Sequence, residues 1–492
     1  MIAIQLNTDE FEYDIRSLVK AFYPDKEQYV HCDVSKVVQQ KPPLKQPDRT
    51  LCVVMNPQDM HAYFLGEEEN AVVVSTVAED RTQRKNDVKR LLYTLLSRKT
   101  GMILPWGSLT GIRPTKLFTR ALEEGRSDYE IMQQMKDSYL ISEAKAKMGL
   151  AIAHKERELL SRLPEKDGYS LYIHIPFCPT TCLYCSFTSF PAKAYAEKMD
   201  AYVAALKREL TMYAEYLKNK ELTTIYVGGG TPTTLSEQQF DDLFLHLQQS
   251  FDTSRVREFT VEAGRPDSIT PEKLKVLRRH GVTRISINPQ TMNDETLKVL
   301  GRRHTVAQTK DAFAMARDCG FDNINMDIIL GLPNEGEEEV RTTLQEIEKL
   351  HPDSLTAHSL AIKHNSRLNL MKEQYSDLKY ADAVFGMELA GESAAKMGMD
   401  PYYLYRQKQI AGNQENIGYA VPGKEGLYNI LIMEERQSIF SIGAGAVTKV
   451  VKTPGQLYER IETVKDVNLY LARLEEMMHK KQDALVRAGL NV

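Results

Sequence analysis

Residues 172–187 form the cysteine-rich stretch YIHIPFCPTTCLYCSF. It places three of the 6 cysteines of the 492-residue chain in one CxxxCxxC loop after an apolar, strand-like run: Cys178, Cys182 and Cys185. Thiolates this close together can converge on one metal centre. A structural zinc ion would need a fourth ligand, for example His174. In an iron–sulfur cluster, three cysteines would leave one iron without a protein ligand, whereas a thioredoxin-like CxxC would leave the third cysteine unused.

The composition predicts a cytoplasmic globular protein. The chain is 42% hydrophobic and 26% charged with a net charge of −4, which argues against a general electrostatic footprint for nucleic acid. Acidic residues stand in the N-terminal MIAIQLNTDEFEYDIR where a signal peptide would need basic ones, and no apolar run is long enough to span a bilayer. Clustered cysteines in a cytosolic chain indicate metal or redox chemistry rather than disulfides. The scattered Cys32, Cys52 and Cys319 are expected to be small core residues.

Six strand-like runs alternate with helix-like stretches from the cysteine loop onward. They lie at 171–176, 223–229, 258–263, 283–289, 323–330 and 354–361. Consecutive β–α units imply right-handed parallel crossovers. We therefore expect an α/β fold with a parallel barrel or part of one, whose functional site lies at the carboxyl ends of the strands. A doubly wound open sheet is the alternative.

The chain is expected to divide into three parts. Residues 1–165 would form an N-terminal α/β accessory domain, because strand-like runs at 51–55 and 71–77 precede helical stretches and the polar segment PEKDG. Residues 166–375 would form the barrel core. Residues 376–492 would form a smaller C-terminal region that caps the substrate and ends in a helix.

The CxxxCxxC loop after the first strand of a β/α series resembles the signature of the radical S-adenosylmethionine (SAM) enzymes. The string YIHIPFC resembles their branch of oxygen-independent coproporphyrinogen III oxidases and HemN- or HemW-like relatives. The whole layout is most similar to the longer HemZ-type coproporphyrinogen dehydrogenases. This resemblance implies a partial (β/α)6 TIM-type barrel. It also implies a [4Fe–4S] cluster held by Cys178, Cys182 and Cys185, with one or two SAM molecules.

Polar residues at successive strand ends match the positions at which this family binds SAM. The glycine run GGGTP ends the second strand, Glu262 the third, Gln290 the fourth and Asp327 the fifth. Taken singly, each polar residue could be a strand-end group satisfied by a helix N-terminus; their order along the chain indicates one site. The resemblance assigns SAM contacts to Tyr172, Tyr184, Gly229, Gly230, Thr231, Glu262, Gln290, Arg302, Asp327 and Ala361.

The activity that the resemblance implies is oxygen-independent oxidative decarboxylation of coproporphyrinogen III. Through a 5′-deoxyadenosyl radical, two propionates would become the vinyl groups of protoporphyrinogen IX; no catalytic side chain is assigned. The carboxylates of this tetrapyrrole require cations, and the candidates are Arg265, Arg303 and Arg406. The expected partners are the small-molecule substrate and an electron donor such as flavodoxin or ferredoxin, with no nucleic acid and no membrane span.

Two departures from the family pattern leave alternatives open. Phe187 stands where the oxidases have a further cysteine, as it does in haem chaperones of the family. Tyr428 and Asn429 stand where those chaperones carry a His-Asn pair, so histidine ligation of haem is not expected there. The alternatives are a haem-binding chaperone of the same family and a radical SAM enzyme acting on another tetrapyrrole such as haem.

Overall fold

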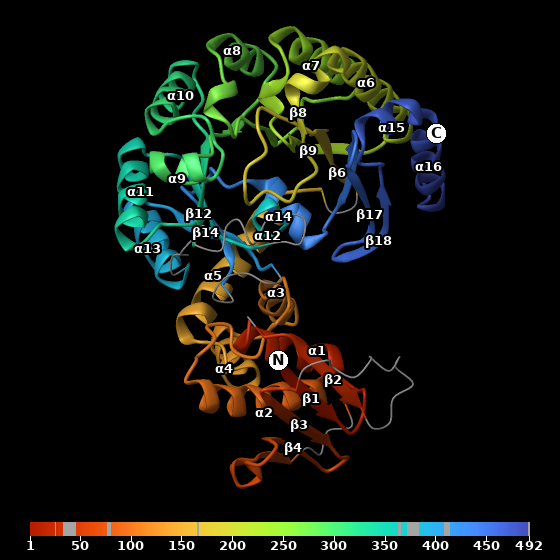
Figure 1. The fold of residues 1–492 in the computed structure, drawn as a ribbon. Helices are drawn as coiled ribbons and strands as arrows, with labels where there is room; N and C mark the ends of the chain where they lie inside the picture. The colour runs from red at the N-terminus through yellow and green to blue at the C-terminus, as the bar shows by residue number, and fades with distance from the viewer. Residues whose placement is uncertain are drawn as a thin grey trace. The chain divides into compact units, whose positions relative to one another are not determined.

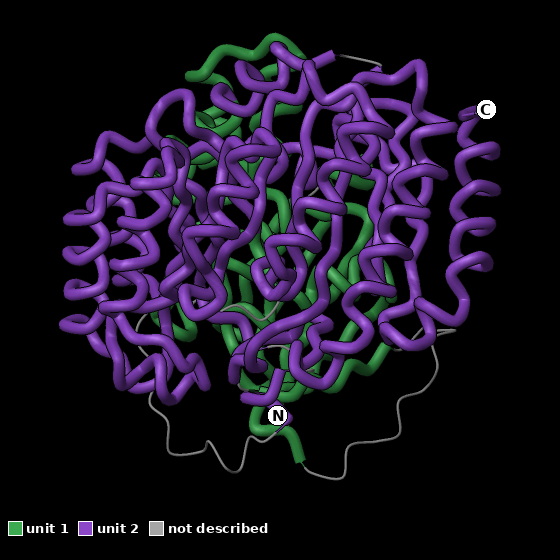
Figure 2. The backbone as a smooth tube through the Cα atoms, turned by 90° about the horizontal axis from the view of Figure 1, so that it is seen from above, with its two compact units in different colours: residues 1–153, 406–409 green, residues 154–405, 410–492 purple. Residues whose placement is uncertain are grey.

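The structure, a computed structural model, describes residues 1–24, 26–32, 46–75, 80–164, 167–362, 366–370, 383–407 and 414–490. The chain forms two compact units, which Figure 2 colours separately. The N-terminal unit comprises residues 1–153 with 406–409, and the larger unit comprises residues 154–405 with 410–492. They divide inside α5 (Glu143–Leu160). The predicted domain boundaries at 165/166 and 375/376 lie outside the described residues.

The N-terminal unit contains a five-stranded sheet in the order β2-β1-β3-β4-β5. β1 pairs in parallel with β2 and β3, while β4 runs antiparallel to β3 and β5. Apolar side chains of the sheet pack with those of the first two helices in one buried core. The elements are β1 (Ile2–Leu6), α1 (Glu12–Phe22), β2 (Gln28–Cys32), β3 (Arg49–Met55), β4 (Asp59–Phe64), β5 (Val72–Ser75), α2 (Arg81–Thr100), α3 (Thr115–Glu123) and α4 (Asp128–Tyr139).

The larger unit is built on an eleven-stranded sheet in which six central strands are parallel. The six predicted runs form β6 (Gly168–Ile175), β9 (Glu221–Gly229), β10 (Glu258–Glu262), β11 (Arg284–Ser286), β12 (Ile324–Leu330) and β13 (Ser354–Ser359). Each pairs in parallel with the next, in chain order. A doubly wound sheet would instead reverse its order at a switch point. The predicted α/β fold with a partial (β/α)6 barrel is therefore confirmed.

Helices line the outer side of the arc of strands, as Figure 1 shows. They are α6 (Met199–Tyr216), α7 (Glu237–Ser250), α8 (Pro271–Arg279), α10 (Val306–Asp318), α11 (Glu337–Leu350) and α13 (Ala383–Lys396). Side-chain caps fix where the loops before them end: the Ser236 hydroxyl accepts a hydrogen bond from the Gln239 amide (3.1 Å), and Thr305 caps α10 in the same way. Among the described helices, none has the length and apolar character needed to cross a membrane.

The C-terminal region extends the same sheet at both edges. β14 (Asp400–Tyr405) and β15 (Asn416–Ala420) continue it beyond β13. β16 (Ser438–Ile442) pairs in parallel with β6 and is followed by the antiparallel β17 (Val447–Thr453) and β18 (Gln456–Glu462). The predicted final helix is present as α15 (Val467–Ala472) and α16 (Leu474–Arg487), and α14 (Leu427–Glu434) lies between β15 and β16 along the chain.

A buried ion pair ties this C-terminal region to the barrel. Glu209 of α6 and Lys481 of α16 are 0% and 1% exposed and pair with one another. The Glu209 carboxylate also accepts hydrogen bonds from the Tyr470 hydroxyl (2.6 Å) and the Gly443 amide (2.8 Å). Lys481 donates to the Ser441 carbonyl at 2.7 Å. Buried charges are tolerated only when paired in this way.

Replacing Lys481 by methionine leaves the Glu209 carboxylate buried without its cation. We expect Lys481→Met to lower the free energy of unfolding by about 3–5 kcal/mol, measured by urea denaturation followed by circular dichroism. The matched control is Lys480→Met on the exposed face of α16, for which a change of at most about 0.5 kcal/mol is expected. Equal losses in both variants would contradict this account.

Candidate functional site

The cysteine loop leaves the sheet at the carboxyl end of β6, and Cys178 belongs to the short strand β7 (Phe177–Cys178). Cys182 is buried, while Cys178 and Cys185 are half-buried. The Cys185 amide donates to the Cys182 carbonyl at 3.2 Å, so a tight turn joins the last two cysteines. Burial raises the pKa of the Cys178 thiol, although a hydrogen bond from Thr231 opposes this shift. A positive metal centre would favour the thiolates that burial disfavours.

The glycine turn after β9 packs directly against this loop. The Gly230 amide donates to the Ile175 carbonyl (2.8 Å), and the Thr231 amide donates to the Phe177 carbonyl (2.7 Å). The Thr231 hydroxyl lies 3.4 Å from Cys178 Sγ. A Cβ on Gly230 would lie 2.7 Å from the Phe177 carbonyl oxygen and 3.0 Å from Cys178 Sγ. Glycine is therefore required because the turn and the cysteine loop approach backbone to backbone.

His174 faces the C-terminal region. Its Nδ1 lies 2.5 Å from the Ala444 carbonyl oxygen, so this nitrogen carries the proton. Burial lowers its pKa to about 4, and the ring is neutral at pH 7. Among the described residues, no group of three or more histidine, cysteine, aspartate or glutamate side chains is arranged around a point where one metal ion could sit. Thiolates that bind different irons of a cluster need not surround a single point.

Arg302 joins the cysteine loop to two strand ends. Its Nη2 donates to the carbonyls of Gly264 (2.8 Å) and Asn288 (2.6 Å), beyond β10 and β11. Its Nη1 donates to the Tyr184 hydroxyl (3.3 Å) and lies 3.9 Å from Cys182 Sγ. Two predicted SAM contacts, Arg302 and Tyr184, are thus brought together beside a predicted cluster ligand.

Two carboxylates on neighbouring parts of the sheet are also predicted SAM contacts: Glu262 ends β10, and Asp327 lies in the middle of β12. Glu262 accepts a hydrogen bond from the Tyr226 hydroxyl at 2.6 Å. Burial raises the pKa of Glu262 to about 7, with Tyr226 opposing and Asp327 adding to the shift. Burial acts on Asp327 too, but hydrogen bonds from His358 and Asn325 and the charge of His358 bring its pKa below the usual value. One carboxylate is therefore ionised throughout the neutral range, while the other titrates within it.

Three tyrosines stack beside Glu262. Ring centroids lie 6.1 Å apart for Tyr172 and Tyr226, 6.0 Å for Tyr172 and Tyr428, and 4.4 Å for Tyr226 and Tyr428. Only Tyr172 was predicted from sequence as a site residue. Tyr226 could have been found, because it is the register partner of Tyr172 on the neighbouring strand. The sequence singled out Tyr428 of α14 only as the counterpart of a chaperone histidine, and no local signal predicted that it would join this stack.

Gln290 was predicted to end the fourth strand, but β11 ends at Ser286 and Gln290 lies four residues beyond it. Gln290 forms an isolated bridge with Ile328 and has a positive φ of 69°. Its amide donates to the Asp327 carbonyl (3.0 Å), and its carbonyl accepts from the Ile329 amide (2.9 Å). These two hydrogen bonds to β12 hold Gln290 in a backbone conformation that residues other than glycine rarely adopt. Such conformations are frequent at ligand sites. Ala361 lies two residues beyond β13, so it too is at the carboxyl edge of the sheet.

The three arginines predicted to bind substrate have different surroundings. Arg265 is buried and ion-paired with Asp267 (2.8 Å) beside the cysteine loop. Arg303 is exposed in the larger unit. Arg406 is grouped with the N-terminal unit, where its Nη1 donates to the Leu109 carbonyl at 2.7 Å. Of the three, Arg303 is the one in the larger unit that is exposed.

The residues present fit a cluster with SAM bound to it. Three thiols supply the donor set, and the backbone cradle at Gly230 leaves no room for a side chain. Two buried polar atoms, Asn288 Oδ1 and Arg302 Nε, have no hydrogen-bond partner among the described residues, and such atoms normally find one. SAM carries cationic and anionic groups that complement Glu262 and Arg302.

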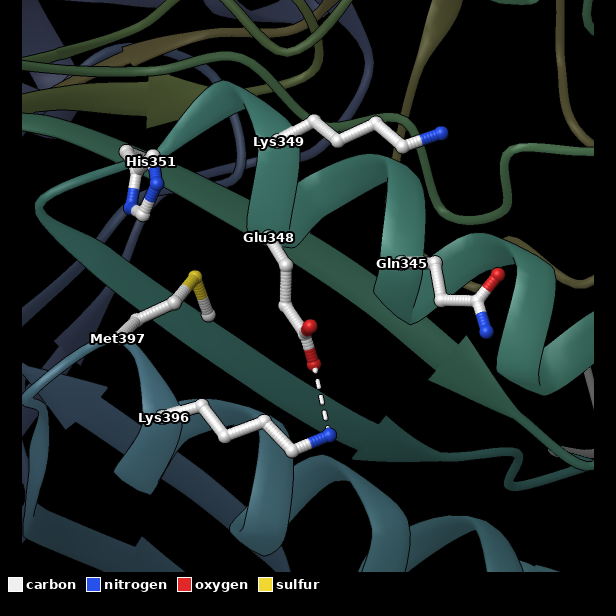
Figure 3. A pocket seen from close by; sticks show the side chains of 6 residues that line it. All are labelled: Gln345, Glu348, Lys349, His351, Lys396 and Met397. Atoms are coloured by element: carbon white, nitrogen blue, oxygen red, sulfur yellow. Dashed lines mark hydrogen bonds and ion pairs between the residues drawn. The ribbon is translucent and has the colours of Figure 1, made fainter.

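A surface pocket of about 370 Å³ lies elsewhere, between the last turns of α11 and α13 (Figure 3). Glu348 and Lys396 form an ion pair of 3.5 Å within it. These helices lead into β13 and β14, so the pocket is at the amino-terminal edge of the sheet, opposite the cysteine loop. Its lining is Gln345, Glu348, Lys349, His351, Lys396 and Met397.

Comparison with known proteins finds relatives for most of the chain. The Radical SAM superfamily matches residues 172–347. The chain is 42% identical over 413 residues to the oxygen-independent coproporphyrinogen-III oxidase-like protein HemZ of Bacillus subtilis, covering 82% of each chain. It is 33% identical over 279 residues to the heme chaperone HemW of Lactococcus lactis, covering 56% of this chain and 68% of that one. The solved structure of coproporphyrinogen III oxidase (HemN) from Escherichia coli has a TM-score of 0.53 at 23% identity, covers 66% of this chain and 73% of that one, and shows a shared fold.

The similarity to HemZ extends well beyond the superfamily match, so it includes regions outside the barrel core. The radical SAM fold implies a [4Fe–4S] cluster and SAM, which agrees with the cysteine loop and the polar strand ends described above. The chain therefore belongs to the radical SAM superfamily and, within it, to the family of HemZ-like, oxygen-independent coproporphyrinogen III oxidase-like proteins.

Proposed function

We propose that the protein catalyses oxygen-independent oxidative decarboxylation of coproporphyrinogen III to protoporphyrinogen IX. The observation that carries the proposal is the joining of the cysteine loop, the glycine turn and Arg302 at the carboxyl ends of adjacent parallel strands. When bound, the cluster and SAM supply the one-electron chemistry that removes a hydrogen atom from a propionate. Each propionate then loses CO2 and one electron and becomes a vinyl group, so an electron acceptor is required.

The side chains of this protein bind and orient the reactants in this proposal. Cys178, Cys182 and Cys185 hold the cluster, and Arg302 and Glu262 fix the charged ends of SAM. In the tyrosine stack, Tyr428 is buried and Tyr172 and Tyr226 are half-buried. Burial raises the pKa of all three hydroxyls and keeps them neutral. The stack therefore excludes water from one side of the site, which protects a reactive intermediate from side reactions.

The substrate in this proposal is a tetrapyrrole that carries carboxylates. Arg303 supplies an exposed guanidinium directly after Arg302, where a propionate could be bound in a forked arrangement. We assign the electron delivery to a flavodoxin- or ferredoxin-type donor and the reaction to the cytoplasm.

A haem chaperone is the second candidate function, favoured by the similarity to HemW. Haem held by a protein needs an axial ligand, most often histidine. At the position predicted to correspond to the chaperone histidine, Tyr428 is stacked on Tyr226 and is 4% exposed. This burial argues against ligation there. A haem titration with a Soret band at one equivalent would favour the chaperone instead.

The decarboxylase proposal predicts a defined product. We expect the anaerobically reconstituted protein, given SAM, a reductant and coproporphyrinogen III, to yield vinyl-bearing product and 5′-deoxyadenosine, measured by mass spectrometry. Cys182→Ala should abolish both, because one cluster ligand is lost. The matched control is Cys319→Ala, which follows α10 outside the site and should retain both products. Formation of 5′-deoxyadenosine with an untouched porphyrinogen would contradict the assigned substrate.

The glycine cradle predicts that a single methyl group disrupts the cluster. Because a Cβ on Gly230 would approach the Phe177 carbonyl oxygen to 2.7 Å, we expect Gly230→Ala to displace the cysteine loop and to lose most of the bound iron. Iron per chain is the measurement. Gly111→Ala is the matched control, since a Cβ there meets nothing within 4 Å. Full iron content in Gly230→Ala would show that the loop and the turn are not coupled.

The raised pKa of Glu262 predicts that SAM binding depends on pH. With a pKa of about 7, Glu262 is mostly protonated at pH 6 and mostly ionised at pH 8, and only the carboxylate attracts a cationic group. We expect SAM affinity to fall about tenfold from pH 8 to pH 6, measured by calorimetry on the reconstituted protein. Glu262→Gln should bind SAM more weakly at pH 8 and lose this dependence. If Glu262→Gln keeps the tenfold change in SAM affinity, the group that titrates is not Glu262.

A further inference from the structure

Two buried guanidinium groups flank one cysteine of the loop. Nη1 of Arg265 lies 4.0 Å from Cys182 Sγ, and Nη1 of Arg302 lies 3.9 Å from the same sulfur. Arg265 is 3% exposed and Arg302 is 5% exposed. Cations are rarely buried so completely without a structural or functional reason. Cys182, the second cysteine of the loop, therefore lies in a positively charged environment.

Arg265 is fixed in this orientation from two sides. Its Nε and Nη2 donate to the two carboxylate oxygens of Asp267 at 2.9 Å and 2.8 Å, a forked geometry. Its Nη1 donates to the Thr180 hydroxyl at 3.0 Å, within the cysteine loop. Turning the guanidinium toward a substrate carboxylate would break all three hydrogen bonds. Arg265 therefore binds the cysteine loop in this structure and is not available to a substrate carboxylate.

The charges around Cys182 do not cancel. Arg265 and Arg302 contribute two positive charges, and Asp267 contributes one negative charge. His304 is also buried here, with both ring nitrogens lacking a hydrogen-bond partner among the described residues. Burial and the two neighbouring arginines lower its pKa to about 3, so it adds no charge at pH 7. A net positive charge remains beside the thiol.

We propose that Arg265 is a positioning residue that holds the cysteine loop through Thr180 and raises the reduction potential of the cluster through Cys182. This inference rests on the cluster assigned under the proposed function. One-electron reduction of the cluster by an external reductant adds a negative charge to it and changes no covalent bond. A nearby cation, or a hydrogen bond to a ligand sulfur, stabilises the reduced form more than the oxidised form.

The roles of Arg265 and Asp267 predict opposite effects on the reduction potential. Removing the cation in Arg265→Gln should disfavour reduction, with the equilibrium constant falling about tenfold, which equals about 59 mV for one electron. Removing the anion in Asp267→Asn should shift the potential in the positive direction. The measurement is a redox titration of the reconstituted protein followed by electron paramagnetic resonance. Arg303→Gln is the matched control and should leave the potential unchanged, because that guanidinium is exposed.

The outcomes separate this inference from the proposed function. Opposite shifts in the two variants support it, whereas a purely structural role would lower cluster content in both without opposite shifts. Unchanged potentials, or shifts of the same sign, overturn it while the cluster itself stands. If Arg265→Gln binds no cluster, the test rests on Asp267→Asn alone. An unchanged or lowered reduction potential in that variant then overturns the inference. Failure of the unsubstituted protein to bind a four-iron cluster would overturn the proposed cofactor, and this inference with it.

Discussion

The close approach of the Gly230 backbone to the Cys178 thiol is the contact on which the candidate site depends. It exists because β6 and β9 are neighbours in parallel register, which brings the loops after both strands to one edge of the sheet. The turn supplies two hydrogen bonds from backbone amides, to the Ile175 and Phe177 carbonyls, and one from the Thr231 hydroxyl to Cys178. A loop held in this way can present its thiols before a metal arrives, which lowers the cost of ordering it on binding.

Charge is distributed unevenly around this contact. Arg265 and Arg302 lie on the side of Cys182, whereas Glu262 ends β10 and Asp327 lies within β12. A ligand with both cationic and anionic groups is thereby given one preferred orientation, since reversing it would place like charges together. The tyrosine stack adds a wall of aromatic rings on one side of the site, and its member Tyr226 donates a hydrogen bond to Glu262. Preorganised charges in a water-excluded site act more strongly than the same charges in solvent.

The sequence predicted the barrel because buried parallel strands are continuous apolar runs, and all six were recognisable. The sequence predicted the cysteine loop and the glycine turn because cysteines at CxxxCxxC spacing and a glycine run after a strand have few other uses. Their roles toward SAM, from Tyr172 to Ala361, stay predictions. Sequence reasoning could not find Tyr428 beside Tyr226, or Asp267 beside Arg265, because such contacts depend on how side chains meet in space. It also missed β17 and β18, in which polar and charged residues interrupt the apolar ones.

The most direct test of the central claim is Mössbauer spectroscopy of the protein reconstituted with 57Fe, recorded with and without SAM. The account predicts a four-iron cluster in which one iron changes its isomer shift on addition of SAM, because three cysteines leave one iron open to a ligand. The other irons should keep their parameters. A spectrum that SAM leaves unchanged, or a preparation that binds zinc in place of a four-iron cluster, would contradict the assignment of Cys178, Cys182 and Cys185 as the ligands of a SAM-binding cluster.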